Sequence, residues 1–367
     1  MCLCATTSFA LQKQNLNCSW PEVKPLDQGS AVSTYTFHYW DFVKNNFSLY
    51  TSENLQKTGY VVGDFHFNNI AIYYSEQTQS ARLAIADLDD SGVAPLLADY
   101  AKYVVSLKEK FKKPNFKPIL QSYLNGLKGS ANRSIPAEIT QLLSQNKNYF
   151  SQLNTNYVLK KLNKDEDQFE KKYPLEKIKN LSEPYKTLAA TTANNLQKSM
   201  TVLDSGFKYN TSGSSLDLLR IQYLVAHSQE QKQILELKQT RCPGTQLFQE
   251  QAEIADRYSQ VLPLFKSEEY WKTTQLIPFN NDTFIFRIKL ANALESLEID
   301  KMSSQQAQVF SEYFAYLLGQ YHSSQADNKY IQEIEKNLDF IQLKIDQFAI
   351  NYLNKLKNDM KNNTRFL

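Results

Sequence analysis

Several oxygen-bearing side chains lie close together in the segment "GYVVGDFHFNNIAIYYSEQTQSARLAIADLDDSG", residues 59–92. One apolar run, residues 60–62, precedes Asp64, and Asn69 follows Asp64 by five residues. A second apolar run, residues 83–86, leads directly into Asp87, and Asp89 lies two residues further on. Mg²⁺ prefers oxygen ligands and often takes one or two protein side chains together with substrate phosphates. Kinase-like phosphoryl transfer also needs a carboxylate beside the attacking hydroxyl, so this spacing favours one site built from these residues.

A second interpretation applies to part of this segment. Asp and Asn commonly stabilise turns, so Asp64 and Asn69 taken alone are more typical of a turn, and the further aspartates are what favour a site. The carboxylates of Asp87, Asp89 and Asp90 would raise one another's pKa unless a cation, hydrogen bonds or solvent offset their charge. We expect His66 to brace the loop through hydrogen bonds rather than to bind a metal.

Composition excludes several classes of function. The 41 Lys and Arg residues nearly balance the 38 Asp and Glu residues, so we expect no nucleic-acid partner. No run of about 18 apolar residues exists, so no membrane span is expected. The cysteines, at positions 2, 4, 18 and 242, have no zinc-binding spacing, and three of them lie near the N-terminus. We therefore expect no disulfide framework across the whole chain.

The first ten residues, "MCLCATTSFA", leave the cellular compartment open. They are similar to the end of a secretory signal peptide but lack its basic first region. The protein would be cytoplasmic if Met1 is the natural start, and exported if residues 1–10 are the end of a signal peptide.

The hydrophobic pattern predicts helices and a hairpin in the first half of the chain. We expect an aromatic helix over residues 34–50, then a strand, a loop and a hairpin over residues 60–85. A helix follows Pro95, with Asp99 near its first turn. Residues 118–200 are predicted to be mostly amphipathic helix, broken at 126–136 and near Pro174 and Pro184.

From Met200 onward the pattern changes to alternating strands. An antiparallel meander is predicted over 202–209, 216–226 and 234–239, followed by a helix over 247–265. A strand pair over 270–277 and 283–290 and helices over 302–323 and 329–358 complete the chain. Lys238 shares one strand face with Glu236, which suits either an inward-facing lysine or an amphipathic edge strand. The prediction is an α+β fold with one small antiparallel sheet and much helix.

Three motifs carry a family resemblance. "GDFHFNN" is similar to the G-D-x-H-x-x-N catalytic loop of aminoglycoside- and choline-kinase-like phosphotransferases, and "IADLDDSG" resembles their metal-binding segment. "LLADYAKYV" resembles the following helix, whose Asp braces the catalytic loop. More closely, the chain resembles the bacterial family catalogued as domain of unknown function 2252, through these motifs and through later segments that include "ILELKQT" and "FIFRIKL".

The resemblance implies a kinase-like two-lobed fold in circularly permuted order, because too few residues precede Gly63 to form a nucleotide-binding lobe. Residues 1–33 would be an N-terminal segment that includes any signal remnant, and residues 34–200 the catalytic-loop and helical lobe. Residues 201–300 would form a nucleotide-lobe-like antiparallel sheet with a helix. Residues 301–367 would be C-terminal helices that pack on the catalytic lobe.

The resemblance also implies a role for each site residue. Asp64 would be the catalytic base, Asn69 and Asp87 would bind Mg²⁺ with help from Asp89, and Asp99 would be a structural brace. Lys238 would contact the phosphates of ATP, near a Gly-rich turn that is reduced here to Gly213. Its acidic partner would come from the helix over 247–265, with Glu253 the first choice and Glu250 the second.

We therefore expect an ATP- and Mg²⁺-dependent phosphotransferase whose acceptor is a small molecule or a protein. Two departures from the family pattern, the reduced turn at Gly213 and Ala86 in place of Asn, leave alternatives open. One is a pseudokinase or a nucleotide- or metal-binding interaction module without catalysis. The same cleft would also suit transfer of a nucleotidyl group, and, if residues 1–10 are a signal remnant, an exported protein that keeps the fold without ATP is a further alternative.

Overall fold

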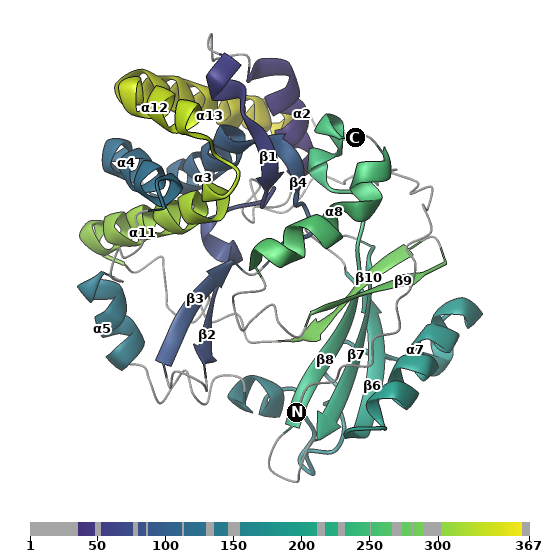
Figure 1. Cartoon of the computed structure of the whole chain (residues 1–367). Helices are drawn as coiled ribbons and strands as arrows, with labels where there is room; N and C mark the ends of the chain where they lie inside the picture. The colour runs from purple at the N-terminus through teal and green to yellow at the C-terminus, as the bar shows by residue number, and fades with distance from the viewer. Residues whose placement is uncertain are drawn as a thin grey trace.

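The computed structural model describes most of the chain between residues 36 and 361. The described residues are 36–47, 53–75, 80–85, 87–111, 114–129, 136–145, 155–210, 217–226, 232–249, 251–265, 274–280, 282–289 and 302–361. A helical part and a sheet part lie side by side (Figure 1), which confirms the predicted α+β class. Gly213, Glu250 and the N-terminal segment lie outside the described residues.

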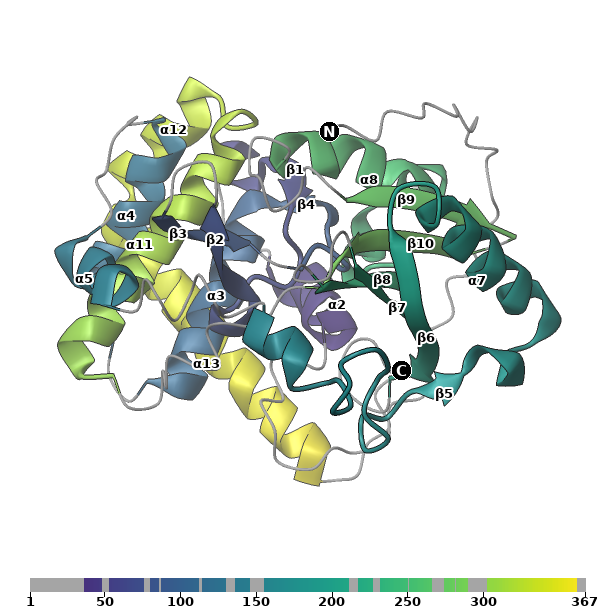
Figure 2. The same cartoon turned by 90° about the horizontal axis from the view of Figure 1, so that it is seen from below.

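The helical part combines helices from both ends of the chain. Its members are α2 (Thr36–Asn46), α3 (Leu96–Lys110), α4 (Phe116–Leu127), α11 (Ser304–Ser323), α12 (Asn328–Lys336) and α13 (Leu338–Lys361). α11 packs along α4, and α13 packs along α3 (Figure 2). Apolar side chains from all of these helices join one core. Among the described helices, none has the length and apolar character that a membrane crossing would require.

The crossing of α4 and α11 depends on two glycines. A Cβ atom on Gly126 would overlap the carbonyl oxygen of Tyr316, and one on Gly319 would overlap the carbonyl oxygen of Tyr123. The two backbones therefore approach more closely than any residue with a side chain would allow at either position.

Two short antiparallel pairs connect α2 to α3. β1 (Thr58–Val61) pairs with β4 (Gly92–Pro95), and β2 (Ile70–Ser75) pairs with β3 (Ser80–Ile85), as the sequence predicted for the hairpin. The loop that carries Asp64 leaves β1, and the segment that carries Asp87 follows β3. Both loops thus lie near the start of α3.

The sheet part is one six-stranded antiparallel sheet in the order β5-β6-β7-β8-β10-β9. The strands are β5 (Glu176–Lys177), β6 (Thr201–Tyr209), β7 (Leu219–Ala226), β8 (Lys232–Gln239), β9 (Gln275–Phe279) and β10 (Asp282–Ile288). The predicted meander and strand pair are both confirmed. The edge-strand alternative for β8 is wrong, because β10 pairs with its other side.

The two faces of β8 have different surroundings. Leu235 and Leu237 join the apolar cluster that lies between the sheet and α7 (Glu183–Leu196). Glu236 and Lys238 lie on the opposite face, and both are almost completely buried. The alternation read from the sequence therefore places Lys238 inside the molecule rather than on an exposed edge.

Two helix predictions need correction. The predicted helical stretch over residues 118–200 has a longer non-helical interruption than expected, because residues 161–182 consist mainly of turns and bends, and α7 begins rather than breaks near Pro184. Proline is well tolerated in the first turn of a helix, where its missing N–H has no partner to lose. The predicted helix over 329–358 is two helices, divided at Asn337, whose side chain bonds back to the carbonyl oxygen of Glu333.

The segment after β8 differs in one detail from the prediction of a single helix over 247–265. A 3₁₀ turn, η4 (Gly244–Phe248), precedes α8 (Gln251–Phe265). Cys242, just before this turn, is buried and disulfide-bonded, and its partner lies outside the described residues.

Candidate functional site

Asp99 fixes the backbone that leads into Asp64. Its Oδ2 accepts a hydrogen bond from the Val62 N–H at 2.8 Å, and its Oδ1 accepts one from the Gly63 N–H at 3.0 Å. Asp99 lies in the first turn of α3 and is completely buried. These are the contacts that the predicted brace requires, and they set the direction in which Asp64 leaves the strand.

Two further buried side chains, His322 and Tyr123, hold Asp99 in place. His322, near the end of α11, lies with Nε2 3.3 Å from Asp99 Oδ2, and both side chains are completely buried. The other ring nitrogen of His322 lies 2.9 Å from the hydroxyl of Tyr123 on α4. Residues from α3, α4 and α11 therefore position one short loop.

Asp64 lies between Lys102 and His66. Its Oδ1 is 3.3 Å from Lys102 Nζ, and its Oδ2 is 3.3 Å from His66 Nε2. Burial alone would raise the pKa of Asp64, but His66 and Lys102 together hold this pKa below its ordinary value. Asp64 is therefore kept as a carboxylate inside the protein, next to the loop that Asp99 fixes.

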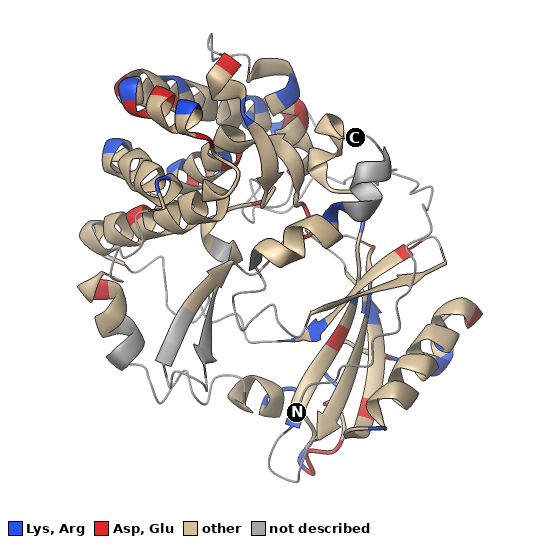
Figure 3. Ribbon diagram, viewed as in Figure 1, with Lys and Arg blue, Asp and Glu red and all other residues tan. Residues whose placement is uncertain are grey.

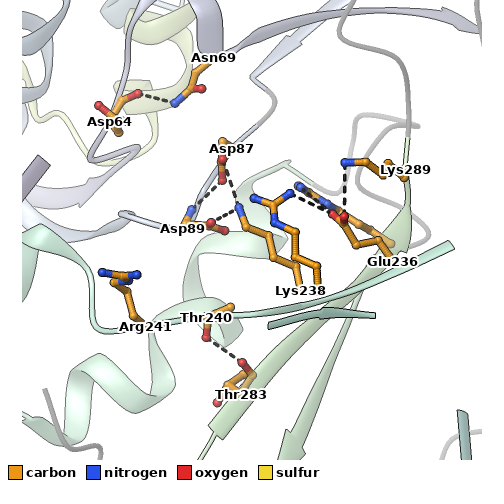
Figure 4. Close-up of polar contacts among 12 residues, drawn as sticks. Asp64, Asn69, Asp87, Asp89, Glu236, Lys238, Thr240, Arg241, Thr283 and Lys289 are labelled. Carbon is orange, nitrogen blue, oxygen red and sulfur yellow. Dashed lines mark hydrogen bonds and ion pairs between the residues drawn. The ribbon is translucent and has the colours of Figure 1, made fainter. Parts of the chain in front are cut away.

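Asn69 closes the same loop. Its Nδ2 donates to the carbonyl oxygen of Asp64 at 2.8 Å, and its backbone N–H donates to the carbonyl oxygen of His66 at 2.9 Å. This arrangement leaves the amide oxygen of Asn69 as its available ligand atom. Figure 4 shows Asp64 and Asn69 on one side of Asp87, with Lys238 on the other side.

Lys238 contacts Asp87 and Asp89, the two carboxylates that follow the β2–β3 hairpin. Its Nζ lies 3.4 Å from Asp87 Oδ2 and forms a second, shorter ion pair with Asp89 Oδ2. The described acidic partners of Lys238 are thus the two predicted metal ligands (Figure 4). Glu253 lies on α8, and its side chain is outside the described part of the structure.

The two carboxylates beside Lys238 differ electrostatically. Burial would raise the pKa of Asp87, but Lys238 and Arg287 hold it well below its ordinary range. Burial and the neighbouring charge of Asp87 raise the pKa of Asp89. A shared cation is the simplest way to keep both groups ionised, because each carboxylate disfavours ionisation of the other.

Asp90 is held apart from this pair by a separate contact. Its Oδ1 accepts a hydrogen bond from the Gly244 N–H at 3.0 Å. Burial and the nearby charge of Asp64 raise the pKa of Asp90 to about 7. Gly63 has a φ of +85° and packs so closely that a Cβ atom there would overlap the Asp90 carbonyl oxygen.

Two of these residues were not predicted as part of the site. Lys102 is completely buried and contacts Asp64, and no signal in the sequence indicated this. Asp90 was noted only as one carboxylate of a crowded group. Its distinct role depends on Gly244, which lies 154 residues away along the chain.

The donor set is compatible with Mg²⁺. Asp89 Oδ1 is buried and has no hydrogen-bond partner in the described part of the chain, whereas its Oδ2 pairs with Lys238. No three described His, Cys, Asp or Glu side chains are grouped to hold a metal on their own. Mg²⁺ needs no such group, because water and substrate phosphates commonly complete its octahedron.

Comparison with known proteins gives a family. Residues 100–365, well over half of the chain, match the family model described as "Uncharacterized protein conserved in bacteria (DUF2252)". The chain belongs to this family. The part matched to DUF2252 includes Lys102 and Lys238 but begins after Asp64, Asn69, Asp87, Asp89 and Asp99. No curated protein and no solved structure matches the chain.

Proposed function

We propose that this member of the DUF2252 family is an ATP- and Mg²⁺-dependent phosphotransferase with a kinase-like fold in circularly permuted order. One observation carries the proposal. Lys238, from the centre of the antiparallel sheet, pairs with Asp87 and Asp89, which follow the hairpin of the other part. Phosphoryl transfer needs this combination of a lysine for phosphates and carboxylates for the metal.

Each residue has a role in this proposal. Asp64, held ionised by Lys102 and His66, would orient and deprotonate the hydroxyl of a small-molecule or protein acceptor. Lys238 would neutralise charge on the transferred phosphoryl group. Asn69, Asp87 and Asp89 would hold Mg²⁺, which supplies Lewis-acid stabilisation of the phosphate oxygens when it is bound.

Ligand-induced stabilisation provides a first test. A ligand at about 100 times its dissociation constant stabilises the folded state by about 2.7 kcal/mol. ATP with Mg²⁺ should therefore raise the melting temperature by a few degrees. Lys238→Ala should reduce this response. Lys232→Ala, on the same strand but paired with Glu166 at the surface, should keep it.

Transfer itself provides the second test. Radiolabelled ATP should lose its γ-phosphate to water or to an acceptor hydroxyl, and Asp64→Asn should slow this reaction by at least about 100-fold. A melting-temperature response without any transfer would favour a pseudokinase or binding module instead. The absence of any response to ATP and Mg²⁺ would contradict both functions.

A further inference from the structure

A buried carboxylate on β8 is surrounded by an excess of cations. Glu236 is completely buried, and Arg220 Nη1, Arg287 Nη2 and Lys289 Nζ lie 3.6, 3.5 and 3.3 Å from its carboxylate oxygens. Gln222 Nε2 donates a hydrogen bond to Glu236 at 2.8 Å. We call Arg220, Arg287 and Lys289 the cationic cluster. Arg287 also lowers the pKa of Asp87 and of Asp89. The carboxylates of Glu236, Asp87 and Asp89 are nevertheless outnumbered by the cationic cluster together with Lys238.

Two further lysines increase this imbalance. Burial and the nearby charge of Arg220 lower the pKa of Lys208. Burial and the charge of Lys208 lower the pKa of Lys161. Within the cluster, burial, Arg220 and Arg287 together bring the pKa of Lys289 down to about 8, against the opposing effect of Glu236. The cations therefore repel one another, and an additional anion would relieve this repulsion.

The cationic cluster adjoins the candidate site. Arg220 on β7 lies directly opposite Lys238 on β8, and Arg287 on β10 lies directly opposite Glu236. Glu236 and Lys238 are two residues apart on one strand, so their side chains share a sheet face roughly 7 Å apart. Figure 3 shows basic positions on the sheet, and Figure 4 shows Glu236 between Lys289 and Lys238, which extends toward Asp87 and Asp89.

The cluster also keeps access to solvent. The side chains of Arg220, Arg287 and Lys289 are 14%, 13% and 18% exposed, whereas Glu236 is not exposed at all. Glu236 is thus the fully buried member of this group, and each of the three cations keeps part of its side-chain surface exposed. Guanidinium groups suit phosphate because their planar N–H donors match its oxygens in pairs.

We propose that Arg220, Arg287 and Lys289 form a binding site for a phosphate-rich anion, adjacent to the Lys238 site and backed by Glu236. The anion could be the phosphate chain of a nucleotide or a free inorganic polyphosphate, because both present the same oxygens. The site needs neither Mg²⁺ nor catalysis, so it goes beyond the proposed phosphotransferase function.

Calorimetric titration with sodium tripolyphosphate tests this site. The full chain is used in EDTA at low ionic strength, so that no metal takes part. We expect one molecule bound per chain, with binding at least tenfold weaker in Arg287→Gln and in Lys289→Gln. Lys232→Gln is the matched control, because Lys232 lies on β8 but pairs with Glu166 at the surface. The affinity of Lys232→Gln for tripolyphosphate should equal that of the wild type.

Glu236→Gln is a more decisive test, because it should increase the affinity for tripolyphosphate rather than decrease it. Without the carboxylate that competes for the cations, tripolyphosphate should bind several-fold more tightly, and a folding defect cannot produce such a gain. If Arg287→Gln does not fold, as judged by circular dichroism, Lys289→Gln and Glu236→Gln decide the matter.

Three outcomes would overturn the proposal: no binding by the wild type, equal weakening in Lys232→Gln and Lys289→Gln, or no gain in a folded Glu236→Gln. A parallel titration with ADP distinguishes the two sources of phosphate. Tighter binding of ADP indicates a nucleotide, and tighter binding of tripolyphosphate indicates a free polyphosphate. Normal tripolyphosphate binding without phosphoryl transfer would contradict only the proposed enzyme function.

Discussion

Nζ of Lys102 lies 3.3 Å from Oδ1 of Asp64, and the lysine side chain is completely buried. Lys102 follows Asp99 by one turn of α3. The same helix therefore fixes the backbone before Asp64 through one residue and stabilises the negative charge of Asp64 through another. This arrangement makes α3 the element on which the geometry and the ionisation of Asp64 both depend.

Lys102→Met should destabilise the protein by about 3–5 kcal/mol at neutral pH, because it leaves a buried carboxylate without its lysine partner. The lowered pKa of Asp64 stabilises the wild type above pH 3.8, and this stabilisation is lost as the pH falls further. In the variant the pKa of Asp64 rises, so protonation relieves the defect on acidification. Urea unfolding should show a smaller difference between the two proteins at pH 4 than at pH 7.5.

The control for this experiment lies on the same helix. Lys108 pairs with Asp346 at 3.1 Å, but both side chains are partly exposed. Lys108→Met should cost no more than about 1 kcal/mol, as for other exposed ion pairs. A Lys102→Met defect of equal size at both pH values would contradict the proposed ionisation of Asp64.

Lys238→Met should increase the affinity for a divalent metal in the absence of nucleotide. The ammonium of Lys238 pairs with Asp87 and Asp89, so removing it leaves two carboxylates without their shared cation. Binding of Mn²⁺, followed by electron paramagnetic resonance, should tighten about tenfold or more. Asp89→Asn combined with Lys238→Met should reverse the gain. Unchanged Mn²⁺ binding in Lys238→Met would argue against a metal at these carboxylates.

Asp90→Asn should change how stability depends on pH. The pKa of Asp90 is raised to about 7, so the folded state binds more protons than the unfolded state between about pH 4 and 7. Stability therefore falls as pH rises through this window, by at most about 1.4 kcal/mol per pH unit. Urea unfolding in EDTA should show a smaller fall between pH 5 and 8 in the variant. Asp165→Asn, at an exposed position, should match the wild type.

Gly63→Ala should be much more destabilising than Gly129→Ala. Both glycines have positive φ, 85° and 60°, so both substitutions cost roughly 1–2 kcal/mol of backbone strain. Only at Gly63 would the new Cβ overlap another atom, the carbonyl oxygen of Asp90, whereas Gly129 has open space. Thermal unfolding measures both costs. Similar losses for the two variants would mean that the contact between Gly63 and Asp90 can relax freely.

The sequence predicted those features that depend on local pattern. Alternation along β8 placed Lys238 on the sheet face opposite to that of the apolar Leu235 and Leu237, and the predicted strand pair over 270–277 and 283–290 overlaps the hairpin of β9 and β10. The position of Asp99 in the first turn of its helix was also readable, because the preceding Pro95 and the following apolar spacing define where that helix begins.

Features that depend on distant pairing were not predictable. A lysine on an amphipathic helix is normally at the surface, so Lys102 gave no sign that it lies inside the protein beside Asp64. The contacts of Glu236 require the register of β7, β8 and β10, which no local pattern specifies. The break at Asn337 was missed because the apolar spacing continues across it, from Ile334 to Ile341.

Because α4 and α11 cross closely, substitutions at their crossing would alter the position of Asp64, although they lie far from the charged residues. Gly126 and Gly319 set the spacing of these helices, α4 carries Tyr123, and α11 carries the His322 that contacts Asp99. Any side chain at either glycine would push these helices apart and shift the support of the loop. A random-mutagenesis screen for inactive protein should therefore recover substitutions of these two glycines alongside those of the acidic residues themselves.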